Sequence, residues 1–199
     1  MNLDEITRQV MGRIFVELEA SGRHVHVTRE QAIALFGHPL TPERELSQPG
    51  QYLAKERVNI ISPKGEFTAV AVLGPERGEG QVEISATDAR TLGITAPVRL
   101  SGSVENTLGI TVQGDKGTIQ LPRGVIIAKR HIHMTPEDAK NMGVADKQVV
   151  RLQVYTGRPL IFDDVVVRVS PQFRTRVHLD YDEANACGFE KGDLGRILP

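Results

Sequence analysis

The sequence predicts a mostly β protein built from two small β-barrel domains, with short capping helices and an N-terminal amphipathic helix. Three observations predict this fold class. Short β-rich runs, broken by glycine and proline, follow one another from residue 22 to near the C-terminus. Short helical segments that end in glycine recur between some of these runs. One stretch of ten residues also recurs in similar form later in the chain. A chain of 199 residues is long enough for two small cores.

The N-terminal segment, residues 1–20, has the pattern of an amphipathic helix because apolar residues recur at intervals of three and four. Two interpretations stay open: the helix packs on the body of the protein, or it is a docking peptide that lays its apolar face on a partner. The apolar positions are Leu3, Ile6, Val10, Ile14, Phe15 and Leu18.

The β-rich runs predict strands, and their number and regular turn signals are typical of a barrel or a sandwich. The helical segments between them share one mechanism. An acidic residue near the start favours the helix N-terminus, glycine permits a left-handed cap, and the next apolar residue re-enters the core. The predicted helical segments are residues 87–94, 137–144 and 182–189. The predicted strands are residues 57–61, 68–73, 81–84, 98–100, 109–112, 124–128, 149–155, 165–169 and 176–179.

The internal repeat is the most informative feature of the chain. Residues 23–32, RHVHVTREQA, recur as residues 130–139, RHIHMTPEDA, with six of the ten positions identical. Such self-similarity predicts duplication of a strand-turn-helix unit, with one copy in each of two related halves. Two similar small barrels are therefore the expected architecture.

Composition limits the partners and the compartment. The net charge of -1 gives no bias towards nucleic acid or anionic lipid, so neither nucleic acid nor a membrane is an expected partner. Cys187 is the only cysteine, and no apolar run approaches the roughly 20 residues of a membrane helix. The first residues also lack the pattern of a secretory signal. We expect an intracellular protein.

Each copy of the repeat contains a His-X-His signature. In a strand, alternate side chains share a face, so His24 and His26 project together, as do His131 and His133. A single pair is more often a surface pair or a hydrogen-bonding pair, but duplication favours metal binding. Catalytic zinc commonly has three protein ligands and one open position, so each pair lacks a third ligand. His178 lies in another predicted strand, at residues 176–179, whereas the sixth histidine, at position 38, reads as an ordinary loop residue.

A glycine-rich turn at residues 73–81 carries Arg77 towards a strand that contains Glu83. The planar guanidinium of Arg77 would suit phosphate, and Glu83 could supply an oxygen ligand to a histidine pair. Taken alone, both residues would be read as surface charges. Cys187, just before a glycine cap, is expected to be a small buried residue and not a catalytic thiol.

Several of these blocks occur in the same order in one known family. The chain resembles the PduL-type phosphate acyltransferases, the phosphotransacylases of bacterial microcompartments, over nearly its whole length. The blocks that carry the resemblance are residues 23–26, 48–52, 73–75 through 81–85, 87–94 and 124–139.

The resemblance implies a domain organisation. Residues 21–128 would form a central barrel that includes a lid over the active site at about residues 37–56. Residues 129–199, completed by an early N-terminal strand, would form the second barrel. Residues 1–20 resemble, in position and character, peptides that direct some family members into microcompartments. Localisation in a microcompartment lumen or in the cytoplasm stays open.

The resemblance also implies the site and the reaction. One zinc ion would be held by His24, His26 and Glu83, and a second by His131, His133 and His178. Arg77 matches the family arginine that holds phosphate beside the metals. The family interconverts acyl-CoA and orthophosphate with acyl phosphate and free coenzyme A, and it fits propanoyl or acetyl groups. The expected partners are acyl-CoA, phosphate, further copies of the chain in a homo-oligomer and, through the N-terminal helix, microcompartment shell or core enzymes.

The chain departs from the family pattern at one point. Many relatives have Ser-Pro or Thr-Pro where this chain has Thr107-Leu108, near the family's coenzyme A site, so we expect altered contacts with acyl-CoA there. Two other functions use the same metals. A zinc hydrolase would direct water to a thioester or phosphoester, and a zinc-stabilised scaffold would use the metals for structure alone.

Overall fold

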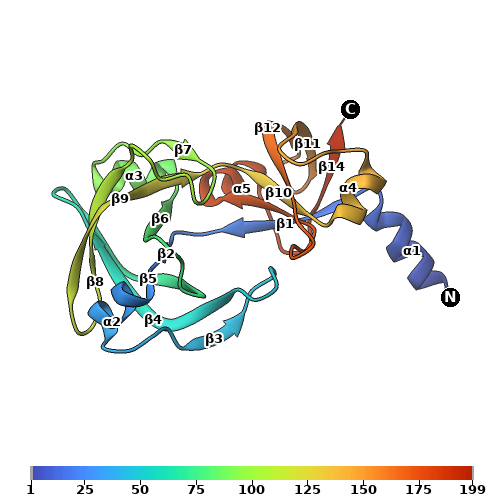
Figure 1. Ribbon diagram of the computed structural model, residues 1–199. Coiled ribbons are helices and arrows are strands. Elements are labelled where there is room, and N and C mark those ends of the chain that lie inside the picture. The colour runs from blue at the N-terminus through green and yellow to red at the C-terminus, as the bar shows by residue number, and fades with distance from the viewer. Residues whose placement is uncertain (1, 199) are drawn as a thin grey trace. The chain divides into compact units, whose positions relative to one another are not determined.

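The computed structural model describes residues 2–198, without the side chains of residues 3, 4, 6, 8 and 9. It divides into two compact units (Figure 1). One unit is Gly22–Ala128, which we call the central barrel. The other contains the chain up to Ser21 and from Lys129 onwards, and we call it the terminal barrel. Each unit contains a closed ring of strands, which confirms the predicted fold class.

The ring of the central barrel runs β4-β5-β2-β6-β9-β8 and closes because β8 pairs with both β9 and β4. Two short strands, β3 and β7, extend this ring beside β4 and β9. The elements of the unit are β2 (His24–His26), α2 (Arg29–Phe36), β3 (Pro42–Glu45), β4 (Tyr52–Ile61), β5 (Glu66–Gly74), β6 (Gln81–Ile84), α3 (Ala86–Leu92), β7 (Val98–Arg99), β8 (Leu108–Gln113) and β9 (Thr118–Ala128).

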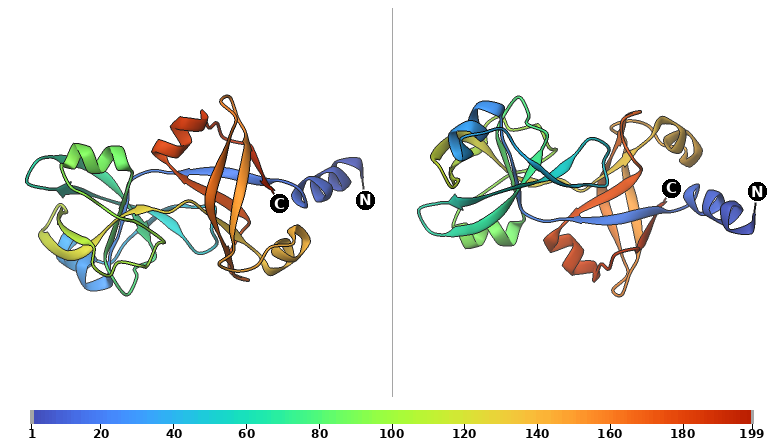
Figure 2. Two further views of the ribbon diagram at one scale, coloured as in Figure 1. Left: turned by 90° about the horizontal axis from the view of Figure 1, so that it is seen from above. Right: turned by 90° about the horizontal axis from the view of Figure 1, so that it is seen from below.

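The ring of the terminal barrel runs β1-β13-β10-β12-β11-β14 and closes between β14 and β1. The N-terminal helix α1 projects from this barrel, and Figure 2 shows it beyond the end of β1. The elements of the unit are α1 (Leu3–Gly12), β1 (Val16–Ser21), β10 (His131–Met134), α4 (Pro136–Met142), β11 (Val149–Tyr155), β12 (Leu160–Val169), β13 (Arg176–Asp180), α5 (Tyr181–Cys187) and β14 (Leu194–Leu198).

Each ring encloses its own apolar core, because inward side chains alternate with outward ones along every strand. The middle residues of the two His-X-His strands, Val25 and Ile132, are fully buried in the two separate cores. Alternation therefore places both histidines of each strand on the face opposite to the core.

The pairing pattern of the two rings is the same. In both, the His-X-His strand pairs in parallel with one neighbour, β5 or β12, and antiparallel with the other, β6 or β13. The strand that precedes each signature, however, completes the opposite ring. β1 comes just before β2 but pairs with β13, whereas β9 comes just before β10 but pairs with β6. In both cases, the strand just before the signature joins the ring that does not contain that signature.

The predicted glycine-ended helices are confirmed as α3, α4 and α5. Their C-caps, Gly93, Gly143 and Gly188, all have left-handed backbones with φ from 63° to 68°. The strand-turn-helix copies are confirmed as well, as β2 with α2 and β10 with α4. Thr28 and Thr135 take the matching N-cap positions of α2 and α4. Among the described residues, no helix is long and apolar enough to cross a membrane.

The prediction of one helix over residues 1–20 is wrong beyond Gly12, because Val16–Ser21 forms the strand β1. Val16 and Leu18 alternate with glutamates, and their side chains are only 1% and 3% exposed in the core of the terminal barrel. Backbone pairing on both sides, with β13 and β14, outweighs local helix propensity. Met1 and the side chains of Leu3 and Ile6 lie outside the described residues.

Candidate active site

Strand register brings the first three predicted ligands together in the central barrel. His24 on β2 lies directly opposite Glu83 on the antiparallel strand β6. The Nε2 atoms of His24 and His26 lie 3.6 Å and 3.7 Å from Oε1 of Glu83. All three residues are buried. They form a compact donor group of two imidazoles and one carboxylate.

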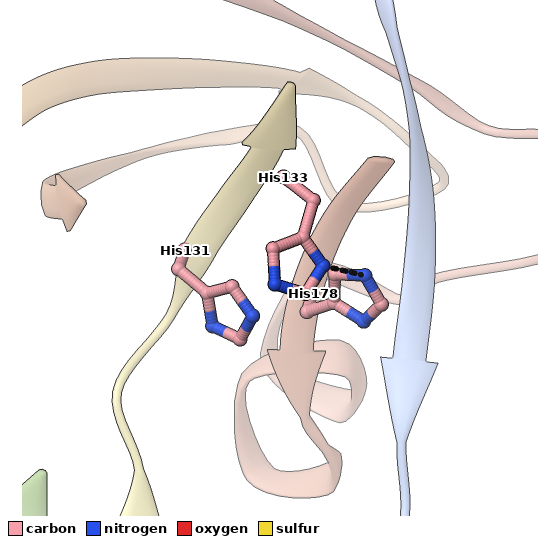
Figure 3. A group of neighbouring side chains, drawn as sticks. All are labelled: His131, His133 and His178. Atoms are coloured by element: carbon pink, nitrogen blue, oxygen red, sulfur yellow. Dashed lines mark hydrogen bonds between the residues drawn. The ribbon is translucent and has the colours of Figure 1, made fainter. Parts of the chain in front are cut away.

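The same register brings together three histidines in the terminal barrel (Figure 3). His131 on β10 lies opposite His178 on the antiparallel strand β13. Nδ1 of His133 lies 3.2 Å from Nε2 of His178, and the rings of His131 and His178 stack with centroids 5.0 Å apart. Two residues of this group are buried and His178 is half-buried.

Both groups have donors that fit zinc. Zinc bonds histidine nitrogen and carboxylate oxygen at about 2.0 to 2.2 Å, so two ligands of a tetrahedral site lie about 3.4 Å apart. Three donor pairs are separated by 3.2 to 3.7 Å, which brackets that value. In each group, the ligand atoms all lie within 4.8 Å of one another. Three protein donors leave a fourth position for water or a substrate.

Backbone carbonyls orient three of the histidine rings. Nδ1 of His24 donates to the carbonyl of Gly22 at 2.8 Å, and Nδ1 of His131 donates to the matching carbonyl of Lys129 at 2.8 Å. Nδ1 of His26 contacts the carbonyl of Leu73 at 3.2 Å. A histidine whose Nδ1–H is held this way offers the lone pair of Nε2 to a metal.

The charges of the central group are strongly coupled. Burial, the nearby His24 and the guanidinium of Arg77 hold the pKa of His26 well below its usual value. Burial also opposes the protonation of His24, but the Glu83 carboxylate outweighs it and raises the pKa of His24. Burial would raise the pKa of Glu83, yet the nearby His24 and His26 hold that pKa far below its usual range. His26 is therefore neutral and Glu83 is ionised at neutral pH, as metal ligands must be.

Arg77 lies beside this group, half-buried in the middle of the glycine-rich turn. Its backbone N–H donates to the carbonyl of Val27 at 2.9 Å, which ties the turn to the chain just after β2. Its Nη1 donates to the hydroxyl of Ser101 at 3.0 Å. The guanidinium lowers the pKa values of both His24 and His26, so its charge reaches the metal donors.

An arginine directly precedes each His-X-His strand, and each of these two arginines forms an ion pair with a carboxylate. Arg23 bonds Asp88 at 2.7 Å, and Arg130 bonds Glu183 at 2.5 Å. In each barrel, a helix follows the strand that carries the third metal donor: α3 follows β6, and α5 follows β13. The carboxylate belongs to the third residue of that helix. Each guanidinium also lies over a phenylalanine ring, that of residue 67 or residue 162. We call these two arrangements the arginine clamps.

Comparison with known proteins adds the family. A family model described as phosphate propanoyltransferase matches residues 17–190. The chain belongs to the phosphate propanoyltransferase family. It is 54% identical to the phosphate propanoyltransferase of Enterococcus faecalis over 99% of this chain and 97% of the relative. It is 53% identical to that of Clostridioides difficile, over 98% and 97%, and 55% identical to that of Thermotoga maritima, over 89% and 86%. The chain is therefore a phosphate acyltransferase.

Two further candidate residues, Cys187 and His38, belong to neither donor group of this phosphate propanoyltransferase family member. Cys187 in α5 is fully buried, and burial raises the pKa of its thiol, which opposes formation of a thiolate nucleophile. His38 lies in a loop with an exposed side chain, and its Nδ1 contacts the carbonyl of Pro39 at 2.7 Å. Both positions match the sequence predictions.

Sequence reasoning missed four polar residues around the donors: Gln81, Ser101 and the two clamp arginines. One signal was present for Gln81, because it lies two residues before Glu83 and so shares its face of the strand. The arginines stand at the start of both repeat copies, which was a second signal. Ser101 lies about twenty residues from Gln81 and Arg77 along the chain, and no local pattern identifies it.

Proposed function

We propose that this enzyme transfers the propanoyl or acetyl group of an acyl-CoA to orthophosphate, with two zinc ions per chain. One ion would be held by His24, His26 and Glu83, and the other by His131, His133 and His178. Family membership supports the acyl transfer to phosphate. The observation that carries the zinc assignment is the pair of matching three-donor groups, each with separations that suit zinc.

Arg77 is the residue that we propose binds phosphate. Its planar fork can donate two parallel hydrogen bonds to phosphate oxygens, and its position beside the central donors would hold phosphate near the metal. Zinc, when bound, supplies positive charge that offsets the charge of phosphate and of a departing thiolate. Held in this way, phosphate meets the thioester with its translational freedom already lost, which is a large part of the catalytic effect.

The transfer of the acyl group to phosphate needs no nucleophile from the protein. A phosphate oxygen forms a new bond to the thioester carbonyl carbon, the carbon–sulfur bond breaks, and sulfur leaves with the electron pair as the coenzyme A thiolate. The buried and protonated thiol of Cys187 takes no part in this scheme. Coenzyme A is thus a substrate and not a resident cofactor.

Residues 37–56 are the segment that we propose as a lid. Two observations support this role. The backbone N–H of Leu40 donates to the carboxylate of Glu76 at 3.0 Å, next to Arg77 in the chain. Gln48 is also buried although it lies in the loop between β3 and β4. Movement of this segment would therefore change the position of the phosphate-binding turn.

The surroundings of the enzyme are a further part of the proposal. Val10 and Met11 of α1 expose 51% and 37% of their surface, which favours the docking interpretation of this helix over packing on the body. Its partners would be microcompartment shell or core enzymes, and the enzyme would be intracellular, in a microcompartment lumen or in the cytoplasm. Assembly as a homo-oligomer stays a prediction.

The decisive experiment combines metal analysis with a phosphate-dependent assay across acyl-CoA lengths. We expect two zinc ions per chain and formation of acyl phosphate that requires both phosphate and metal. His131→Ala with His133→Ala should leave one zinc and remove activity, whereas Arg77→Ala should raise the KM for phosphate about 10- to 100-fold. Thioester loss that is indifferent to phosphate would identify a hydrolase instead. Full activity of the metal-free enzyme would contradict the metal assignment.

A further inference from the structure

Ser101 occupies the turn after β7 and is bonded to Arg77 and Gln81. Its oxygen accepts one hydrogen bond from Nη1 of Arg77 and one from Nε2 of Gln81, both at 3.0 Å. A serine hydroxyl has two acceptor positions, so both are used.

Gln81 completes this network from the strand β6. Its side chain is 3% exposed, and its amide nitrogen donates to Glu83 at 2.5 Å as well as to Ser101. Its amide oxygen accepts from the backbone N–H of Gly102 at 2.8 Å. The amide therefore fixes the carboxylate on one side and the turn on the other. Buried polar networks of this kind set geometry, because any change leaves a donor or acceptor unpaired.

The terminal barrel has a different residue at the position of Gln81. Gln81 lies opposite His26 in the strand register, and Arg176 lies opposite His133 in the matching register. Arg176 bonds Glu17 at 2.8 Å. Of the two matching positions, only the one in the barrel that carries Arg77 has a glutamine.

We propose that Ser101 and Gln81 are positioning residues that connect the phosphate-binding Arg77 to the metal donor Glu83. This inference rests on the proposed function. Ser101 orients one Nη of the guanidinium and the amide nitrogen of Gln81, which in turn holds one oxygen of the carboxylate. Loss of the hydroxyl therefore disturbs phosphate binding and zinc binding together, although Ser101 contacts neither ligand.

The test uses the full chain with Ser101→Ala and, as matched controls, Ser103→Ala in the same turn and Ser101→Thr. Ser103 is exposed, and threonine restores a hydroxyl. Zinc affinity of the central group is measured by chelator competition in a chain that also carries His131→Ala and His133→Ala. The KM values for phosphate and acyl-CoA are measured without those two changes.

Ser101→Ala is expected to weaken zinc binding about tenfold, as loss of an outer-shell partner does, and to raise the KM for phosphate about tenfold. The KM for acyl-CoA should stay within about twofold, which a general loss of stability would not achieve. Adding Ser101→Ala to Arg77→Ala should raise the KM for phosphate little further, because the two residues act through one contact. Ser101→Thr should recover most of both losses.

Two results separate this inference from the proposed function. An unmodified chain that binds no zinc, or forms no acyl phosphate, overturns the proposed function and the inference with it. An unmodified chain that does both, while Ser101→Ala keeps its zinc affinity and phosphate KM within about twofold, overturns the positioning role alone. Equal losses in Ser103→Ala overturn it too, because that change leaves the network in place.

Discussion

At the scale of single residues, two neighbouring histidines on one strand have opposite protonation behaviour. Burial, His24 and Arg77 keep His26 neutral, whereas Glu83 overcomes the effect of burial and favours the protonated form of His24. His24 is therefore the group whose proton competes with a metal. Because zinc binds only the neutral imidazole, occupancy of the central group depends on pH through His24.

We predict that His24 of the metal-free protein titrates above the ordinary histidine value of 6.5, while His26 stays neutral well below it. Since the folded-state pKa of His24 is raised, its contribution to stability is present below pH 6.5 and is lost as pH rises through the raised pKa. Imidazole NMR titration, assigned with His24→Gln and His26→Gln, measures both groups.

Glu83→Gln is the informative variant for this prediction. It removes the carboxylate charge, so the pKa of His24 should fall below its value in the unmodified protein. Zinc affinity of the unmodified central group should fall about tenfold for each pH unit below the pKa of His24. A His24 titration that is identical in the Glu83→Gln protein would contradict this account.

At the scale of elements, the arginine clamps join the strand of the first two donors to the helix after the third donor. Arg23 joins β2 to α3 through Asp88, and Arg130 joins β10 to α5 through Glu183. Each carboxylate also caps its own helix, because it accepts from the backbone N–H of the N-cap residue. The side chain of the N-cap residue accepts in return from the backbone N–H of the carboxylate residue. The clamps thus fix the spacing between strands whose side chains must converge on one ion.

We predict that each clamp supports one metal group selectively. Arg23→Met should weaken zinc binding at the His24 group about tenfold, the low end for outer-shell changes, and leave the His131 group unchanged. Arg130→Met should do the reverse. Methionine retains much of the apolar contact with the phenylalanine ring, so the change isolates the ion pair.

Chelator competition, with one histidine group removed at a time, assigns each loss to its site. Arg90→Met is a matched control, because this arginine lies in the last turn of α3 and is exposed. If either clamp variant weakens both groups equally, the clamps act through overall stability and the selective role is wrong.

At the scale of the whole molecule, the terminal barrel depends on a strand from the other end of the chain. β1 closes the terminal ring between β13 and β14, and β9 closes the central ring between β6 and β8. A ring that lacks one strand exposes two edges and part of its core. Residues 129–198 therefore cannot complete the terminal ring without β1, whereas β9 lies within the continuous segment that forms the central ring.

We predict a sharp difference between two N-terminal truncations. Removal of residues 1–13 deletes α1 and should leave the stability and zinc content of the chain unchanged. Removal of residues 1–21 also deletes β1, so the terminal barrel should unfold and the His131 group should lose its zinc. Thermal unfolding and zinc analysis measure both outcomes.

A milder pair of substitutions controls for side effects of truncation. Leu18→Ala, at a buried position of β1, should cost about 2 to 4 kcal/mol, whereas Met11→Ala, at an exposed position of α1, should change stability by less than about 0.5 kcal/mol. Equal destabilisation by the two truncations would show that α1 belongs to the terminal fold.

Much of the fold could be predicted from the sequence because its signals are local. The caps Thr135 and Gly143, for example, lie at the two ends of α4, and both act on backbone groups within one turn. The two His-X-His copies are equally local, since alternation along one strand is enough to pair their side chains. The helix prediction for residues 1–20 missed β1 because a stretch that begins with helical spacing gives no sign of the two distant strands that pair with it. Only the resemblance implied an early strand in the second barrel.

By itself, the sequence determined the duplicated His-X-His signatures, the helix caps, the β-rich class and, through resemblance, the family with its implied third donors. The residues alone left those third donors open. Only the tertiary structure decided that Glu83 lies opposite His24 and His178 opposite His131, because strand register joins residues that are remote along the chain. Only it placed Ser101 and Gln81 between Arg77 and Glu83, since such a hydrogen-bond network forms after the strands have paired.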